Sequence, residues 1–357
     1  MSEHFPAELL ARLPGFLVPW FLRAKRDLEW RNDPTPYRVW ISEIMLQQTR
    51  VEAVKPYYDR FLAELPDIAA LAAVDETRLL KLWEGLGYYR RVRNLQAAAK
   101  KIVREYGGVF PDTYDNVRNL PGIGDYTAGA ILSIAFGKPF PAIDGNVLRV
   151  VSRLAASRED TDSPRIRKEL TAALAAVYPD GHCSEFTQSL MELGATVCLP
   201  NGAPLCTACP LAGICLASQQ GLTDEIPVRK AKAARPEKEF AVVVLRDAKG
   251  RFAVRRRPET GLLAGLYEFP GLEGSHSETA LKKAFRADRI RKAGTAKHVF
   301  THVEWHMTLY LAETSDPPDG FEWVGRTALQ SETAIPSAFK VALKLALDPD
   351  SFQGGKP

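Results

Sequence analysis

A helical pattern of hydrophobic positions fills the larger, N-terminal part of the chain. From about residue 5 to residue 218, apolar residues recur with a period near 3.6, and prolines and glycines interrupt the pattern. Within residues 39–50, one face carries Ile41, Ile44, Met45 and Gln48, and Glu43 lies on the opposite face. We therefore predict an all-α region over residues 1–223.

The pattern changes towards the C-terminus. Residues 224–239 are polar and punctuated by proline, a composition typical of a linker. Strand features then appear at residues 240–245, 252–254 and 298–310, and helical patterns appear at residues 277–289 and 336–347. We predict an α+β domain over residues 240–349.

Composition limits the class of protein. The 357 residues are 46% hydrophobic and 25% charged, which is typical of a globular protein with two or three domains. No apolar run is long enough to cross a bilayer and no secretory signal begins the chain, so we expect a cytoplasmic monomer without a membrane partner. The net charge of +4 permits nucleic-acid binding without requiring it.

A glycine-rich turn separates two helical patterns at residues 119–128. Gly122 and Gly124 let the backbone turn tightly and approach another molecule closely. The amides of residues 122–124 then face outward at the N-terminus of a helix predicted over residues 125–136, which suits a DNA phosphate. A plain joint between two helices is the alternative for such a turn taken alone.

An aspartate follows the second of these helices. Asp144 directly precedes an amphipathic helix. The alternative for this residue taken alone is a simple N-cap of that helix, without a catalytic role. The combination of hairpin, helix, proline-containing loop and Asp-Gly-Asn-Val is more specific, and it resembles the endonuclease III superfamily of base-excision repair DNA glycosylases. This resemblance implies a helix-hairpin-helix body. It has a six-helix part over about residues 29–139, and an iron–sulfur part formed by the N-terminal helix and residues 140–223.

The resemblance implies roles for two residues. Breaking an N-glycosidic bond builds positive charge on the sugar, and the family's aspartate, here Asp144, stabilises this cation and helps to control the nucleophile at C1′. Members that also cleave the DNA strand carry a lysine in the second helix of the hairpin, where this chain has Tyr126. Because that amine nucleophile is missing, we predict a monofunctional glycosylase.

A second motif, at residues 30–49, indicates the substrate. Glu43 taken alone is an ordinary solvated helix residue, but the stretch resembles the adenine-specific (MutY-type) mismatch glycosylases. In these the matching glutamate protonates N7 of adenine, which requires a shielded pocket that raises its pKa. The resemblance implies excision of adenine mispaired with 8-oxoguanine or guanine in double-stranded DNA.

The same resemblance implies further residues that contact DNA. Trp30, Arg31 and Gln188 surround the extruded adenine, whereas Gln48, Thr49 and Tyr88 contact the opposite base and fill the gap in the stack. For Tyr88 the alternative is a partly buried aromatic residue of the core.

Four of the five cysteines lie in one short segment. Cys198, Cys206, Cys209 and Cys215 supply enough ligands for one zinc ion or one iron–sulfur cluster, and their spacing alone does not choose between these. The family resemblance favours a [4Fe–4S] cluster, although the first gap has seven residues where six are usual. Cys183 stands apart, and we expect a buried thiol.

The C-terminal region resembles the Nudix fold at residues 242–245, 255–258 and 265–271. Its metal-binding box is incomplete. Glu278 and Arg286 keep the spacing of the box, but Ala287, Ile290 and Arg291 stand where magnesium-binding glutamates are expected. Because Mg²⁺ needs oxygen ligands, we predict that this domain binds rather than hydrolyses.

Three histidines, His298, His302 and His306, fall within the predicted strand 298–310. Residues four apart on a strand lie about 13 Å from each other, too far to share a metal ion. Phe300-Thr301-His302 matches the Phe-Ser-His loop with which the family senses 8-oxoguanine. Thr301 keeps the hydroxyl group and adds a methyl group, so we predict lesion recognition by this domain.

Three other functions compete with this interpretation. An endonuclease III-like pyrimidine glycosylase with lyase activity is disfavoured by Tyr126 and by the C-terminal domain. A non-catalytic lesion-binding protein would need neither Glu43 nor Asp144. Hydrolysis of nucleotides by the C-terminal domain is disfavoured by the incomplete metal-binding box.

Overall fold

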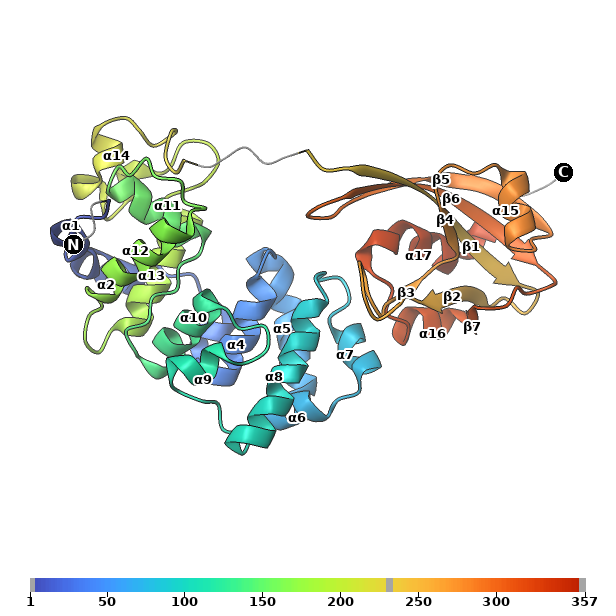
Figure 1. Cartoon of the computed structure of the whole chain (residues 1–357), viewed down its shortest axis with the longest axis horizontal. Helices are drawn as coiled ribbons and strands as arrows, with labels where there is room; N and C mark the ends of the chain where they lie inside the picture. Colours follow the sequence, from blue (N-terminus) through green and yellow to red (C-terminus); the bar gives the residue numbers. More distant parts are fainter. Residues whose placement is uncertain (1–3, 229–233, 353–357) are drawn as a thin grey trace. The chain divides into compact units, whose positions relative to one another are not determined.

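The computed structural model describes residues 4–228 and 234–352. Its contacts divide the chain into two compact units: the first comprises Met1–Ala73 and Asn94–Lys232, and the second comprises Val74–Arg93 and Ala233–Pro357. The described part of the first unit is helical, and the second contains a mixed β-sheet (Figure 1). This confirms the predicted combination of an all-α body and an α+β domain.

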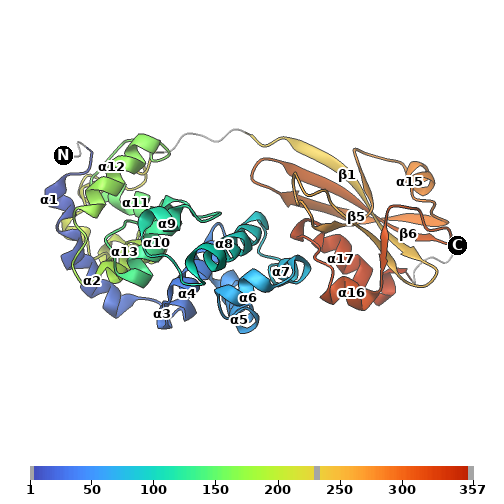
Figure 2. The same ribbon diagram turned by 60° about the horizontal axis from the view of Figure 1, so that its bottom comes forward.

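The helical body is built from short and medium helices joined by loops. The helices are α1 (Ala7–Leu10), α2 (Leu13–Ala24), α3 (Glu29–Asn32), α4 (Pro36–Leu46), α5 (Val51–Glu64), α6 (Ile68–Ala73), α8 (Arg90–Tyr106), α9 (Tyr114–Arg118), α10 (Asp125–Phe136), α11 (Gly145–Leu154), α12 (Pro164–Ala175), α13 (Cys183–Thr196), η1 (Cys206–Ala208), η2 (Ala212–Ile214) and α14 (Leu216–Gln219). In Figures 1 and 2, α1 and α2 lie beside α12 and α13, which they contact. The N-terminal helices therefore pack with the later part of the helical body.

Helix α10 is the central helix of this body and contacts α4, α9 and α13. Its residues 127–133 are all buried, and it ends at Gly137, whose left-handed backbone (φ 65°) is a common helix C-cap. A Cβ atom on Gly129 would lie 2.2 Å from the carbonyl oxygen of Pro141. The absence of a side chain at Gly129 thus allows the loop after α10 to cross the helix closely, and this loop leads directly to Asp144.

The second unit contains a seven-stranded sheet. Its strands are β1 (Glu237–Asp247), β2 (Phe252–Arg256), β3 (Tyr267–Glu268), β4 (Gly271–Glu273), β5 (Arg289–Val299), β6 (Glu304–Thr314) and β7 (Glu322–Val324). The main order is β3-β2-β1-β6-β5, with β1 and β6 parallel and the other pairs antiparallel. Helices α15 (Glu278–Ala284), α16 (Arg326–Ser331) and α17 (Lys340–Leu347) accompany the sheet, with the short helices η3 (Ser337–Phe339) and η4 (Pro349–Phe352).

The single strand predicted over residues 298–310 is wrong. Residues 300–303 form the turn between β5 and β6, closed by a hydrogen bond from the Phe300 amide to the Val303 carbonyl. The strands are antiparallel, and alternation of polar and apolar residues continues across the turn, so the pattern concealed it. The three histidines therefore lie on β5, in the turn and on β6, and the argument from spacing along one strand does not apply to them.

The predicted linker 224–239 is also too long. Ile226 is buried, its carbonyl accepts a hydrogen bond from Arg153 Nε at 2.8 Å, and Val228 pairs with Asp160. Strand β1 already begins at Glu237. Residues 229–233 lie outside the described part of the chain. The polar composition concealed these attachments because they use backbone atoms and a single apolar side chain.

Part of the predicted helical region groups with the second unit. The segment Val74–Arg93 includes α7 (Glu76–Leu82). Within this unit Lys81 Nζ donates to the Thr333 carbonyl at 3.1 Å, and Glu84 Oε1 accepts from the Ile335 amide at 2.8 Å. A boundary drawn from composition alone misses such a segment, because its own pattern is helical.

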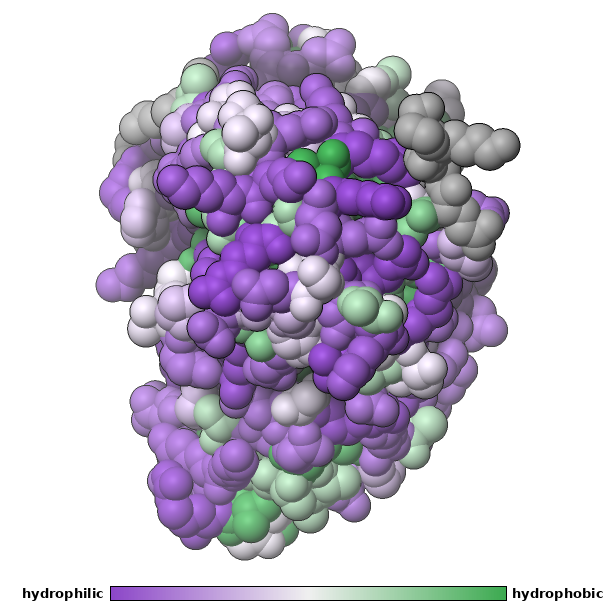
Figure 3. All heavy atoms as spheres, turned by 90° about the vertical axis from the view of Figure 1, so that its right-hand side faces the viewer, coloured by the Kyte–Doolittle hydropathy of each residue, from purple (hydrophilic) through white to green (hydrophobic). Residues whose placement is uncertain are grey.

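The face seen in Figure 3 is largely polar, and hydrophobic residues form only small spots on it. Among the described residues, no helix combines the length and the apolar character that spanning a membrane requires.

Candidate active site

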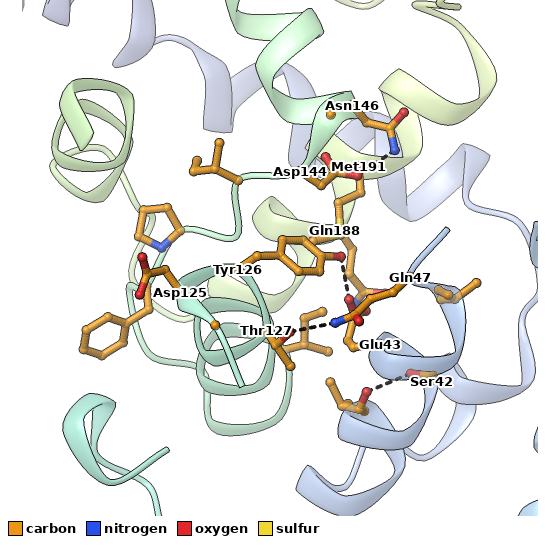
Figure 4. Close-up of a pocket in the computed structure, with 18 of the residues that line it drawn as sticks. Ser42, Glu43, Gln47, Asp125, Tyr126, Thr127, Asp144, Asn146, Gln188 and Met191 are labelled. Atoms are coloured by element: carbon orange, nitrogen blue, oxygen red, sulfur yellow. Dashed lines mark hydrogen bonds between the residues drawn. The ribbon is translucent and has the colours of Figure 1, made fainter. Parts of the chain in front are cut away.

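A cavity of about 1450 Å³ opens in the helical body, and nearly all the residues predicted for catalysis and base binding line it (Figure 4). Those that line it are Glu43, Tyr126, Asp144, Trp30, Arg31, Gln188, Gln48, Thr49, Gly122 and Gly124. They come from α3, α4, α10, α13 and the loops before α5, α10 and α11. The fold therefore brings together residues that are up to 158 positions apart, from Trp30 to Gln188.

Glu43 is buried within α4, with only 6% of its surface exposed. Burial raises the pKa of Glu43 to about 7, although the hydrogen bond that Tyr126 donates to its Oε2 at 2.5 Å lowers it. The negative charge of Asp144 raises it further. Glu43 thus has the shielded surroundings that the family resemblance implies, and the alternative of a solvated helix residue is excluded, because all residues of α4 from Val39 to Met45 are buried.

Tyr126 lies in the first turn of α10 and points at Glu43 (Figure 4). Burial raises the pKa of Tyr126 well above its usual range, and the negative charge of Glu43 adds to this effect. Its hydroxyl group therefore keeps its proton and serves as a donor to Glu43. This contact was not part of the sequence-based expectation, which considered Tyr126 only as the replacement of a lysine.

Asp144 is at once the N-cap of α11 and a wall of the cavity. Its Oδ1 accepts from the Val147 amide at 2.8 Å, and its Oδ2 accepts from Asn146 Nδ2 at 2.7 Å. Burial raises the pKa of Asp144, whereas these two hydrogen bonds lower it. The capping role does not compete with catalysis here, since it fixes the carboxylate in place at the cavity.

Asn146 extends the hydrogen bonding of Asp144 further into the protein. Arg149 Nη2 donates to Asn146 Oδ1 at 2.9 Å, and its Nε donates to the carbonyl oxygen of Cys198 at 2.7 Å. Asn146 and Arg149 are three residues apart on one face of α11, a signal that the sequence offered and the sequence analysis missed.

The predicted adenine pocket contains Trp30, Arg31 and Gln188. Trp30 is buried, and its ring contacts Tyr58 edge-on with centroids 5.5 Å apart. Arg31 Nε donates to Gln188 Oε1 at 3.0 Å, and its Nη2 donates to Glu192 Oε2 at 2.8 Å. No local pattern marks Glu192 as part of this site, because a glutamate on a helix is usually solvated.

The hairpin residues Gly122 and Gly124 line the mouth of the same cavity. Gly122 has a positive φ of 77°, and a Cβ atom there would lie 2.6 Å from Cβ of Asn94. Gly124 is the N-cap of α10 and offers no side chain to the first amides of the helix. This arrangement suits an anion at the helix N-terminus, as predicted.

Gln48 and Thr49 follow the C-terminus of α4, where Gln48 has a left-handed backbone with φ 57°. Such a conformation is costly for a residue with a side chain and is concentrated at functional sites. Beside them, Gln47 Nε2 donates to Thr127 Oγ1 at 3.3 Å, which ties this end of α4 to α10.

Tyr88 does not line the cavity and belongs to the second unit. Its side chain is 50% exposed and its φ is 47°, so the alternative of a core aromatic residue is excluded. Its hydroxyl group lies 2.9 Å from Oγ1 of Thr301. Phe300 packs edge-on against Trp305 at 4.9 Å, while Thr301 and His302 are exposed.

The four predicted metal ligands, Cys198, Cys206, Cys209 and Cys215, line one small cavity, and none of them forms a disulfide. A single zinc ion bound at about 2.3 Å would hold its four sulfur atoms about 3.8 Å apart. No three of these sulfur atoms lie within 4.8 Å of one another. The wider spacing suits a cluster of several iron atoms better than one zinc ion.

The surroundings of this cavity carry positive charge. Arg153 is buried, and its Nη1 donates to Cys198 Sγ at 3.2 Å. Arg153 therefore places a positive charge beside the first of the predicted ligands. Cys183 lies elsewhere and is buried, as expected.

The incomplete Nudix box lies at α15 and the start of β5. Ala287 is buried, and Arg291 Nη2 donates to the carbonyl oxygen of Ser351 at 2.6 Å. Glu278 Oε1 accepts from the Lys292 amide at 2.9 Å. The side chains at these positions are therefore occupied with structural contacts.

Comparison with known proteins decides the family. Residues 41–175 match the family described as HhH-GPD superfamily base excision DNA repair protein, and residues 241–345 match the NUDIX domain. The chain is 34% identical to the adenine DNA glycosylase of Mus musculus over 86% of its own length and 73% of the relative. The chain belongs to the adenine DNA glycosylase family.

Further relatives agree with this assignment. The adenine DNA glycosylase of Homo sapiens is 32% identical over 96% of this chain and 74% of its own. That of Buchnera aphidicola subsp. Acyrthosiphon pisum (strain APS) is 33% identical over 83% of this chain and 85% of its own. These matches confirm the family that the motifs around Glu43 and Asp144 indicated.

The fold of the family is confirmed by two solved structures. A thermostable thymine-DNA glycosylase has a TM-score of 0.55 and 26% identity, covering 60% of this chain and 98% of that structure. A non-covalent endonuclease III–DNA complex has a TM-score of 0.52 and 24% identity, covering 61% of this chain and 98% of that structure.

Proposed function

We propose that this member of the adenine DNA glycosylase family excises adenine mispaired with 8-oxoguanine or guanine from duplex DNA, without cleaving the strand. One observation carries the proposal. Buried Glu43, with a pKa raised to about 7, faces the same cavity as Asp144. One carboxyl group can then hold a proton near neutral pH while the other supplies negative charge.

The base is proposed to leave as a neutral molecule. After the nucleotide is extruded from the duplex, Glu43 donates its proton to N7 of adenine, and the bond between N9 and C1′ breaks with its electron pair moving to the base. Without this proton the leaving group would be an anion. Tyr126 holds the carboxyl group of Glu43 in place.

Asp144 is proposed to stabilise the positive charge that develops on the sugar. Its two hydrogen bonds, from Val147 and Asn146, fix the carboxylate before the reaction begins, so that little reorganisation is needed. Water then adds to C1′, and its proton leaves to a carboxylate or to solvent. The products are adenine and an abasic site.

Strand cleavage is not expected, because the nucleophile is water. A lyase needs an amine that attacks C1′, and Tyr126 stands at the family position of that amine. The raised pKa of Tyr126 keeps its hydroxyl group protonated and therefore a poor nucleophile.

Duplex DNA is proposed to bind through the hairpin and the end of α4. The glycines at residues 122 and 124 leave the N-terminus of α10 open to a phosphate, and Gln48 and Thr49 face the opposite base. In the second unit, exposed Tyr88 is proposed to fill the gap in the stack, and residues 300–302 to recognise 8-oxoguanine.

A [4Fe–4S] cluster is the proposed resident cofactor. Cys198, Cys206, Cys209 and Cys215 would hold it, with Arg153 beside the first sulfur atom. When bound, the cluster orders the segment that follows α13 and takes no part in hydrolysis. The four side chains of this chain supply the complete ligand set.

A single-turnover assay tests the substrate. Duplexes carrying adenine opposite 8-oxoguanine, guanine or thymine are incubated with excess enzyme. Adenine release is measured, and strand breaks are measured before and after alkali treatment. We expect release from the first two duplexes, with strand breaks only after alkali. Equal release opposite thymine, or strand breaks before alkali, would contradict the proposal.

A further inference from the structure

A buried ion-pair network lies behind the predicted adenine pocket. The carboxylate of Glu192, on α13, has no exposed surface. Arg26 binds it through Nε at 2.7 Å and Nη2 at 2.9 Å, and Arg31 binds it through Nη2 at 2.8 Å. Because burying charged groups costs free energy, a contribution to stability alone does not explain the network. Its function lies in the side chain whose orientation it fixes.

The network holds the guanidinium group of Arg31 in one orientation. Its Nη2 donates to Glu192, its Nη1 donates to the carbonyl oxygen of Arg26 at 2.9 Å, and its Nε donates to Gln188 Oε1 at 3.0 Å. The guanidinium also lies over the ring of Phe21, 5.2 Å from its centroid. Burial alone would raise the pKa of Glu192, but the hydrogen bonds from the two arginines hold it at about 2, so its charge persists at neutral pH.

Arg31 in turn fixes the amide group of Gln188. A guanidinium group has only donors, so the amide atom that faces Nε of Arg31 must be the oxygen. On the other side, Gln188 Nε2 donates to Ser184 Oγ at 3.1 Å. Rotating the amide by 180° would set its NH₂ group against the donors of Arg31 and break that contact, whereas the Ser184 hydroxyl group could donate to the rotated oxygen instead, so the Arg31 contact is the one that selects the orientation.

The fixed amide leaves a defined pair of groups for a base. Gln188, which lines the cavity (Figure 4), keeps one acceptor position on Oε1 and one free N–H on Nε2. Adenine presents a 6-amino donor beside a ring-nitrogen acceptor, which matches this pair. Hypoxanthine and guanine present a 6-oxo acceptor beside an N–H donor, which matches the rotated amide instead.

We propose that Glu192 is a positioning residue that locks the Gln188 amide for adenine and against 6-oxopurines. Glu192 acts through Arg31, whereas Ser184 contacts the amide without selecting its orientation. This inference rests on the proposed function and names how the same site selects its base. Neither residue touches the base.

The test compares two bases in the same duplex context. Single-turnover rates are measured for adenine and for hypoxanthine, each opposite 8-oxoguanine, with the wild type, Glu192→Gln, Ser184→Ala and Glu185→Gln. The ratio of the two rates is the readout, because general damage slows both reactions and leaves it unchanged. Glu185→Gln is the matched control, since Glu185 also lies on α13 but pairs with His182 outside the network.

We expect the wild type to release adenine at least about 100-fold faster than hypoxanthine. Glu192→Gln is expected to lower this ratio at least about tenfold, whereas Ser184→Ala and Glu185→Gln are expected to leave it nearly unchanged. An equal fall of both rates in Glu192→Gln would overturn the proposal, as would a wild type that removes both bases equally fast.

Folding is checked by circular dichroism and by the absorbance of the purified protein. If Glu192→Gln does not fold, Glu192→Asp decides, because its shorter side chain keeps the charge but places it farther from Arg31, and an unchanged ratio in that variant overturns the proposal. Failure of the wild type to release adenine at all would instead contradict the proposed function, so the two failures are distinguishable.

Discussion

At the scale of single residues, the proposed chemistry depends on two carboxyl groups with different surroundings. Glu43 is buried and receives a hydrogen bond from Tyr126. Asp144 receives two, from Val147 and Asn146. Hydrogen bonds stabilise the charged form of a carboxyl group, so the residue with fewer of them is better suited to hold a proton.

The pH dependence of catalysis follows from these surroundings. The active form needs Glu43 protonated, and the pKa of Glu43 is raised to about 7, so the rate of adenine release should fall as the pH rises through about 7. It should also fall at low pH, where Asp144 takes up a proton. Single-turnover rates between pH 5 and 9 check this. A rate that keeps rising above pH 8 would contradict the role of Glu43.

Replacing Tyr126 by phenylalanine tests the hydrogen bond to Glu43. The bond lowers the pKa of Glu43, so its loss should raise that pKa and move the fall in rate to higher pH. Tyr126→Phe should therefore be slower relative to the wild type at pH 6 than at pH 8.5. Tyr114→Phe is the control, because its hydroxyl group donates to Asp125 at 3.1 Å and does not contact Glu43. Identical profiles for wild type and Tyr126→Phe would refute this coupling.

At the scale of elements, α10 positions the site through its close contact with the following loop. Gly129→Ala would force a Cβ atom to 2.2 Å from the Pro141 carbonyl, so it should lower the free energy of unfolding by about 1–3 kcal/mol. Gly15→Ala is the control, because nothing lies within 4 Å of its added Cβ. Urea denaturation measures both. Equal stability of the two variants would show that the loop yields easily.

The elements also show what the sequence can predict. Helix α10 spans Asp125–Phe136 as expected, because glycines mark both of its ends. The strand predicted over residues 298–310 is wrong because side-chain alternation alone does not mark a turn between antiparallel strands. Local sequence patterns thus predict helices and strands well where capping residues mark their ends, and poorly where no such residues mark them.

Site residues that lie in recognisable sequence motifs could be predicted. Asp144, Glu43 and the shielded surroundings of Glu43 were predicted from the family resemblance, whereas periodicity alone set Glu43 opposite the apolar face and missed that every residue from Val39 to Met45 is buried. The place of Glu192 in the site was not predicted, because its burial depends on Arg26 and Arg31, which lie more than 160 positions away in the sequence. Tertiary contacts of this kind leave no local signal.

At the scale of the whole molecule, the residues proposed for catalysis and those proposed for lesion recognition lie in different units. The first holds Glu43 and Asp144, and the second presents exposed Thr301 beside exposed Tyr88. We propose that the second unit adds affinity for the oxidised base and leaves the chemistry to the first.

This division predicts the effect of Thr301→Ala. The variant should lose about tenfold in its preference for 8-oxoguanine over guanine opposite adenine, while its rate on the guanine duplex stays near that of the wild type. Thr327→Ala is the control, since Thr327 is also exposed in the second unit. Competition between the two duplexes measures the preference. An equal loss on both duplexes would assign Thr301 a structural role instead.

The central claim, that Glu43 and Asp144 together release adenine, is tested most directly by single-turnover adenine release from a duplex with adenine opposite 8-oxoguanine. Glu43→Gln should be slower than the wild type by about 10²–10⁴-fold, and Asp144→Asn by about 10²–10³-fold, with both variants folded and still binding the duplex. Release at the wild-type rate by either variant would contradict the account.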